Sequence, residues 1–199
     1  MTRSRQAALL LVVAGLTGAA WPVSANPLEA CIACHTAPAP QATPAIVAPV
    51  LGGQPVAYLT TQMYLFRERL RKPEWMGDFL QGWTDEDLQA AAEQLAKLPK
   101  PVPPPLTPEQ QSAQVQQRER FQTLSAQHRC SFCHGAGWQG QDNVPALAGQ
   151  HEAYLLSSLR AYKDNTRAGY DGTMAEVVHD LSDTDLQELA FSIAHAGSP

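Results

Sequence analysis

Two short segments with the same residue pattern constrain this chain more than any other feature. They are Cys31–His35, with the sequence CIACH, and Cys130–His134, with the sequence CSFCH. Together they contain all four cysteines of the 199-residue chain. Four cysteines in an exported protein first suggest two disulfides, and a C-x-x-C pair can also be a redox dithiol or half of a zinc site. None of these interpretations requires the histidine that follows each pair, so its presence in both motifs would be a coincidence.

The spacing C-x-x-C-H is instead the one at which haem c is attached to a protein. We therefore predict two haem c groups, each bonded through thioethers to one cysteine pair. The thioether cysteines would be Cys31, Cys34, Cys130 and Cys133. The adjacent residues, His35 and His134, are predicted to ligate the two irons from one side. The sixth ligand then decides the chemistry, because a second strong ligand favours electron transfer, whereas an open position permits binding or catalysis.

The two motifs begin two copies of one repeated unit. Each is followed by a segment of the form Pro-x-Leu-x-Gly-Gln, at Pro49–Gln54 and Pro145–Gln150, and then by Tyr-Leu. Each copy ends with a hydroxyl residue, Thr84 or Ser182, that has an acid three residues later, which is the capping-box pattern of a helix start. Apolar residues follow at helical spacing, and neither copy shows a convincing period-two strand. The sequence therefore predicts an all-α fold.

The repeat also separates the methionines. Met76 lies 41 residues after His35 and Met174 lies 40 residues after His134, in what we expect to be matching loops before the last helix. A thioether sulfur is an established haem ligand, so we predict Met76 and Met174 as the second axial ligands. Met63 aligns instead with a leucine inside the middle helix of the second copy, where methionine is a common filler of the core.

Histidines are the competing candidates for the second axial position. The remaining ones are His128, His151, His179 and His195, and none has a counterpart in the first copy. His179, five residues after Met174, is the strongest competitor and would give bis-histidine ligation. The others are expected to be solvated or hydrogen-bonded residues.

Two prolines and two arginines of the repeat can each be interpreted in two ways, which are compatible for the prolines and competing for the arginines. The backbone carbonyls of Pro49 and Pro145 could accept the ring N–H of the axial histidines and fix their orientation, and both prolines could also simply form turns. Arg71 and Arg167 could pair with haem propionates, or could be exposed arginines near the ends of helices.

Composition divides the chain into four parts. Residues 1–25 resemble a secretory signal with a basic start, an apolar stretch and a small-residue cleavage site, the rival interpretation being an uncleaved anchor. Residues 26–98 and 109–199 are the two predicted domains, each with one haem. Residues 99–108 form a proline-rich linker, which we expect to be an extended, semi-rigid spacer. Thr107 should cap the next helix, which has proline at its first position and should run to about Arg129.

The charge of the chain limits its partners. Of its 14 Lys and Arg residues, two lie in the signal, so 12 remain against 19 Asp and Glu and the mature chain carries a formal charge of −7. An acidic surface argues against nucleic acid and anionic lipid and suits redox partners with basic patches. No later segment is long and apolar enough to span a membrane, so any membrane association would be peripheral, through partner complexes.

Tandem C-x-x-C-H units, each with Pro-x-Leu-x-Gly-Gln, a Tyr-Leu helix and a late methionine, resemble the dihaem class I c-type cytochromes of the cytochrome c4 type. The resemblance covers nearly all of residues 26–199. It implies two class I cytochrome c folds, each wrapped around a haem with His–Met iron. It also implies a periplasmic electron carrier with no catalytic residues, which passes electrons from a quinol-oxidising complex towards a terminal oxidase or reductase. The alternatives are a dedicated cytochrome subunit of a dehydrogenase complex and, less favoured, a dihaem peroxidase.

Overall fold

The structure is a computed structural model that describes residues 27–35, 48–103, 105–167 and 172–196. Within these ranges the regular secondary structure is helical, as the sequence predicts. One isolated β-bridge joins Gln141 and Val144. The first half has α1 (Pro27–Cys34), α2 (Val56–Arg67), α3 (Glu74–Leu80) and α4 (Asp85–Ala96). The second half has α5 (Pro108–Gln127), α6 (Cys130–His134), α7 (Glu152–Lys163), α8 (Thr173–Val178) and α9 (Asp183–Ala194). The predicted signal segment 1–25 lies outside the described residues.

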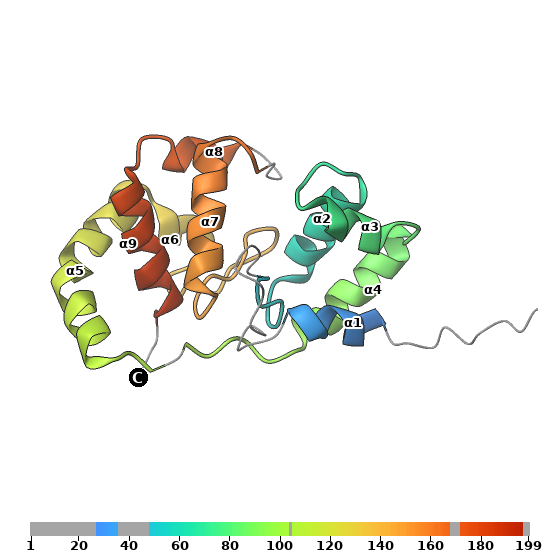
Figure 1. Cartoon of the computed structure of the whole chain (residues 1–199), viewed down its shortest axis with the longest axis horizontal. Helices are drawn as coiled ribbons and strands as arrows, with labels where there is room; N and C mark the ends of the chain where they lie inside the picture. The colour runs from blue at the N-terminus through green and yellow to red at the C-terminus, as the bar shows by residue number, and fades with distance from the viewer. Residues whose placement is uncertain (1–26, 36–47, 104, 168–171, 197–199) are drawn as a thin grey trace, which may run out of the picture.

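Each half has its own apolar core, and Figure 1 shows the two halves side by side. In the first half α2 packs against α3 and α4, and in the second half α7 packs against α8 and α9 while α5 covers α9. The buried residues at the centres of the two cores include Leu88 and Leu95 of α4, and Leu186 and Leu189 of α9. These are the helical-spacing positions that the sequence predicts. None of the helices in the described ranges is both long enough and apolar enough to cross a bilayer.

Helix starts follow the predicted caps. The Thr84 hydroxyl accepts from the Asp87 N–H while the Asp87 carboxylate accepts from the Thr84 N–H, which completes a capping box at α4. Ser182 and Asp185 form the same box at α9, and Thr107 caps α5 with Pro108 at its first position. Caps of this kind contribute about 1 kcal/mol each to stability.

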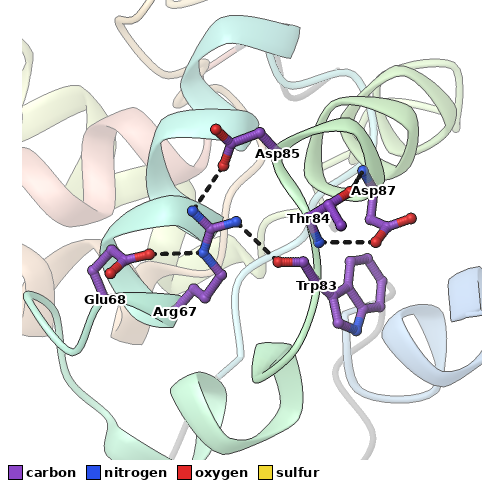
Figure 2. Close-up of polar contacts among 6 residues, drawn as sticks. All are labelled: Arg67, Glu68, Trp83, Thr84, Asp85 and Asp87. Atoms are coloured by element: carbon purple, nitrogen blue, oxygen red, sulfur yellow. Dashed lines mark hydrogen bonds and ion pairs between the residues drawn. The ribbon is translucent and has the colours of Figure 1, made fainter.

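In both halves a basic residue at the end of the middle helix forms hydrogen bonds with the segment that begins the last helix. Figure 2 shows that Arg67, at the end of α2, donates to the Trp83 carbonyl at 3.0 Å and to the Asp85 carboxylate at 2.7 Å. In the second half Lys163 at the end of α7 donates to the Leu181 carbonyl, which is the matching position. The Arg67–Asp85 ion pair lies at the surface, where the Asp85 side chain is 78% exposed, and such pairs contribute little to stability.

The proline-rich segment lies against both halves instead of spacing them apart. It runs from one half to the other along one edge of the molecule (Figure 1). A Cβ atom added to Gly52 would lie 2.1 Å from the Pro99 carbonyl oxygen, and one added to Gly149 would lie 2.6 Å from that of Pro101. The segment therefore passes directly over the glycine turns of both repeats. The bounds predicted for the signal, domains and linker stay predictions.

One local expectation holds only to within two residues, and another was wrong. The helix before the second cysteine motif ends at Gln127, and Arg129 takes a left-handed conformation with φ 53° before α6 begins at Cys130. Met76 and Met174 do not lie in loops, because each is part of a short helix, α3 or α8. A stretch of six or seven residues is too short to show an apolar period in the sequence.

Candidate haem sites

The cysteine pairs lie on short helices, α1 and α6. Residues three apart on a helix share a face, so both thiols of a pair can reach one planar group, and the histidine in the next position lies close to the same face. No disulfide joins any of the four cysteines, all of which lie within the described ranges. Burial raises the pKa of Cys31 and of Cys130, so both are neutral thiols at physiological pH. The disulfide interpretation is therefore not supported.

The two histidines are oriented as the sequence predicts. The Nδ1 atom of His35 lies 2.8 Å from the Pro49 carbonyl oxygen, and that of His134 lies 3.0 Å from the Pro145 carbonyl oxygen. A carbonyl can only accept, so Nδ1 must carry the proton in each ring, which leaves the Nε2 lone pair free to bind a metal. Burial lowers the pKa of both histidines, and the charge of Arg71 lowers that of His35 further. Both rings are therefore held in the neutral form that iron requires.

The predicted methionines lie against the same cores as the cysteine motifs. Cys31 and Met76 pack partly buried against the core of the first half, and Cys130 and Met174 pack in the same way against that of the second half. Met63 is 9% exposed and is itself a member of the first core, as expected. The structure thus brings each cysteine motif and its late methionine to one core, and ligation by Met76 and Met174 stays a prediction.

The competing histidines have other surroundings. The His179 side chain is 72% exposed at the end of α8. His128 Nδ1 lies 3.0 Å from the Val177 carbonyl oxygen. Nδ1 of the buried His195, the residue that follows α9, lies 2.9 Å from the Phe191 carbonyl oxygen of that helix. His151 immediately precedes α7. His179, the strongest competitor, is thus mostly exposed to solvent, whereas Met76 and Met174 pack against the two cores.

Arg71 and Arg167 are not exposed arginines, which corrects one of the two interpretations. Arg71 is 9% exposed, and it donates to Gln62 and, at 3.0 Å, to the Tyr154 hydroxyl of the other half. Arg167 donates at 3.4 Å to the Tyr58 hydroxyl. Both arginines are covered because the other half of the molecule packs over them.

Each arginine also keeps one unused buried donor. The Nε atoms of Arg71 and Arg167 are buried and have no hydrogen-bond partner. Burial raises the pKa of Tyr154, but the charges of Arg167 and Arg71 outweigh this effect and lower it to about 7. Buried N–H groups in an excess of positive charge are suited to carboxylates, and haem carries two as its propionates. The cysteines, the neutral imidazoles and these donors together fit haem c.

Two further repeat-matched pairs lie between the halves, and their contacts with the opposite half were not predicted from the sequence. Gln54 and Gln150 are buried there, and Tyr58 and Tyr154 accept hydrogen bonds from the arginines of the opposite half. The available signal was a polar residue at the same position of both repeats within otherwise apolar segments. Such a repeated polar residue indicates that both copies share a role, but it does not indicate which residue each one contacts.

The chain is similar in sequence to known proteins. The cytochrome c family model matches residues 119–191. A thiosulfate dehydrogenase electron acceptor from Thiomonas intermedia is 31% identical over 185 residues, which cover 88% of this chain and 82% of that protein. A cytochrome c4 from Thiocapsa roseopersicina is 30% identical over 165 residues, or 80% of this chain and 83% of that protein.

Solved structures have the same fold. The crystal structure of reduced recombinant cytochrome c4 from Pseudomonas stutzeri superposes with a TM-score of 0.69 at 24% identity, and covers 84% of this chain and 93% of that one. The fold is therefore that of two class I cytochrome c units in tandem. With the cysteine motifs and the two long relatives, this shows that the chain belongs to the dihaem class I c-type cytochromes of the c4 type, which are haem c proteins of electron transfer.

Proposed function

We propose that this chain carries two haem c groups and passes single electrons between redox partners without catalysing a reaction of its own. Haem 1 would be held by Cys31 and Cys34 with axial His35 and Met76. Haem 2 would be held by Cys130 and Cys133 with axial His134 and Met174. When bound, each haem supplies a reversible one-electron change of its iron.

The observation that carries this proposal is that both halves repeat the same histidine environment. His35 and His134 are neutral, and each has its Nδ1 proton directed at a proline carbonyl, so each ring offers Nε2 in a fixed orientation. A fixed ring needs little rearrangement when the iron changes charge, which suits electron transfer. The Nε donors of Arg71 and Arg167 would neutralise propionates at the boundary between the halves.

The test is a redox titration with optical spectra on the purified protein, together with its intact mass. Two haems with histidine–methionine ligation would give a mass increase of two haems, two one-electron steps and a far-red sulfur-to-iron absorption band. Turnover of peroxide by the resting protein, or free binding of small molecules to either iron, would favour the peroxidase alternative, because both require an open axial position.

We further propose that the protein works in the periplasm after removal of residues 1–25. Its formal charge of −7 favours partners with basic patches, and exposed charges steer such partners less strongly as salt rises. N-terminal sequencing of the exported protein tests the cleavage site at Ala25. Retention of Met1 or of the apolar stretch would support an anchored form instead.

A second candidate is the dedicated acceptor of a dehydrogenase complex. It is favoured because a protein named as a thiosulfate dehydrogenase electron acceptor is similar over 88% of this chain. On this proposal a thiosulfate dehydrogenase plus thiosulfate should reduce this protein rapidly, with a rate that falls as salt is added. Ascorbate, a small reductant that needs no docking surface, is the control. Equal rates with the dehydrogenase and with ascorbate at all salt concentrations would exclude specific partnership.

A further inference from the structure

The glutamine that ends each Pro-x-Leu-x-Gly-Gln segment binds the backbone of the other half. The Gln150 side-chain oxygen accepts from the Val50 N–H at 2.9 Å, and its amide nitrogen donates to the Val50 carbonyl oxygen, also at 2.9 Å. Gln150 is 3% exposed and Val50 is 4% exposed. This contact is buried, and it joins residues that are 100 positions apart in the chain.

The same peptide group also holds the axial histidine of the first half. The N–H of Val50 and the carbonyl of Pro49 belong to one peptide unit, and that carbonyl lies 2.8 Å from Nδ1 of His35. A continuous path of two hydrogen bonds and one peptide group therefore leads from the His35 ring to the Gln150 side chain.

The second half repeats the path in the opposite direction. The Gln54 side-chain oxygen accepts from the Ala146 N–H at 3.0 Å, and its nitrogen donates to the Ala146 carbonyl oxygen at 2.8 Å. The carbonyl of Pro145, in the same peptide unit as the Ala146 N–H, lies 3.0 Å from Nδ1 of His134. Each axial histidine is thus connected through one peptide to a glutamine of the other half.

We propose that Gln150 and Gln54 are positioning residues that set the electron donation of the axial histidine in the opposite half, so that docking of the halves tunes both irons. The inference rests on the proposed ligation by His35 and His134. A hydrogen bond to the N–H end of a peptide polarises its carbonyl, and hydrogen bonds in series strengthen one another at low dielectric. A stronger acceptor at Nδ1 makes the imidazole a better donor to its metal.

The sign of the effect follows from this path. Without Gln150 the Pro49 carbonyl accepts more weakly, His35 donates less to iron, the oxidised form is less stabilised, and the potential of haem 1 rises. If Gln150→Leu only disturbed the packing of the two halves, the potential of haem 1 would fall instead. Water entering the boundary between the halves would stabilise the more highly charged oxidised iron. The direction of the shift therefore separates the two explanations.

The experiment compares three variants of the haem-loaded protein by spectroelectrochemistry. Gln150→Leu removes both hydrogen bonds to Val50, together with the one that the Gln150 oxygen accepts from the neighbouring His151 N–H at 3.0 Å. It should raise the potential of haem 1 and leave that of haem 2 unchanged. Gln54→Leu is the matched control and should raise only the potential of haem 2. Gln150→Glu keeps an oxygen that accepts from the Val50 N–H, so it should leave the potential of haem 1 at or below the wild-type value.

Two NMR observations keep the test decisive if a leucine variant folds poorly. In the reduced protein, Gln150→Glu should shift the ¹⁵N resonance of His35 Nδ1 more than that of His134. In the wild type, the Val50 and Ala146 amides should exchange with solvent only when the halves separate. The inference is overturned if Gln150→Leu lowers the potential of haem 1, if it shifts both haems equally, or if Gln150→Glu and Gln150→Leu shift it alike. Failure of the proposed function would look different, as a missing haem or a changed ligand spectrum in the wild type.

Discussion

Arg71 and Tyr154 meet across the boundary between the two halves, where the arginine donates to the tyrosine hydroxyl at 3.0 Å. Arg167 and Tyr58 make the same contact in the opposite direction at 3.4 Å. Both arginines come from the segment after a middle helix and both tyrosines from the start of one. The two repeats therefore bind each other through equivalent residues, as the two subunits of a symmetric dimer do.

Replacing Arg71 should lower the stability of the folded protein. In Arg71→Met, the buried side chain of Gln62 and the hydroxyl of Tyr154 each lose a partner, so we expect a loss of about 1–3 kcal/mol in the free energy of unfolding. Arg69→Met is the control, because Arg69 makes its ion pair with Asp78 on the surface, and such pairs contribute at most about 1 kcal/mol. Denaturant unfolding of the haem-loaded proteins measures both. Equal losses in the two variants would contradict the role of Arg71.

Gly52 should tolerate no side chain. A Cβ atom there would lie 2.1 Å from the Pro99 carbonyl oxygen, which is backbone and cannot rotate away. Gly52→Ala should therefore displace the linker and cost about 1–3 kcal/mol, the range for overpacked sites. In Gly172→Ala the nearest atom is a flexible carboxylate oxygen at 3.9 Å, so this variant should unfold like the wild type. If thermal unfolding finds both variants unchanged, the linker does not rest on this turn.

The sequence predicted those parts of the fold that depend on near neighbours. The capping boxes at Thr84 and Ser182 are local patterns of four residues, so they were visible without the fold. The hydrogen bonds from the histidines to Pro49 and Pro145 were one of the two interpretations that the sequence allowed, because the prolines occupy the same place in both repeats. Local chemistry combined with an internal repeat was enough for these features.

The features that the sequence did not predict depend mainly on how the two halves pack against each other. Arg71 looked like an ordinary arginine near a helix end, because the residue that covers it is Tyr154, far along the chain. Gln150 was visible as a repeated residue, but its partner Val50 belongs to the other half. The break between α5 and α6 was missed because Arg129 takes a left-handed conformation that is more usual for Gly or Asn.

Each cysteine motif should account for one haem. The double variant Cys31→Ala, Cys34→Ala removes both thioether partners in the first half, so its intact mass should be lower by one haem than that of the wild type, after allowing for the two substitutions. Cys130→Ala, Cys133→Ala should lose the other haem. Because the two cores are separate, the half that keeps its haem should still give the spectrum of a six-coordinate centre. A variant that loses neither or both haems contradicts one attachment site in each half.

The identity of the second axial ligands can be tested within each repeat. A methionine ligand raises the potential of a haem iron, so Met76→Ala should lower only the potential of haem 1 and Met174→Ala only that of haem 2. Met63→Leu is the control, because Met63 is a buried core residue and a swap of similar volume should cost less than about 1.5 kcal/mol and leave both spectra unchanged.

The central claim is that each half holds an iron between an imidazole and a thioether. A redox titration of the wild type, Met76→Ala and Met174→Ala, followed at the far-red sulfur-to-iron band, tests this most directly. The account predicts two one-electron steps with the full band in the wild type, and half of the band with one lowered potential in each variant. Unchanged potentials and an unchanged band in both variants would contradict it.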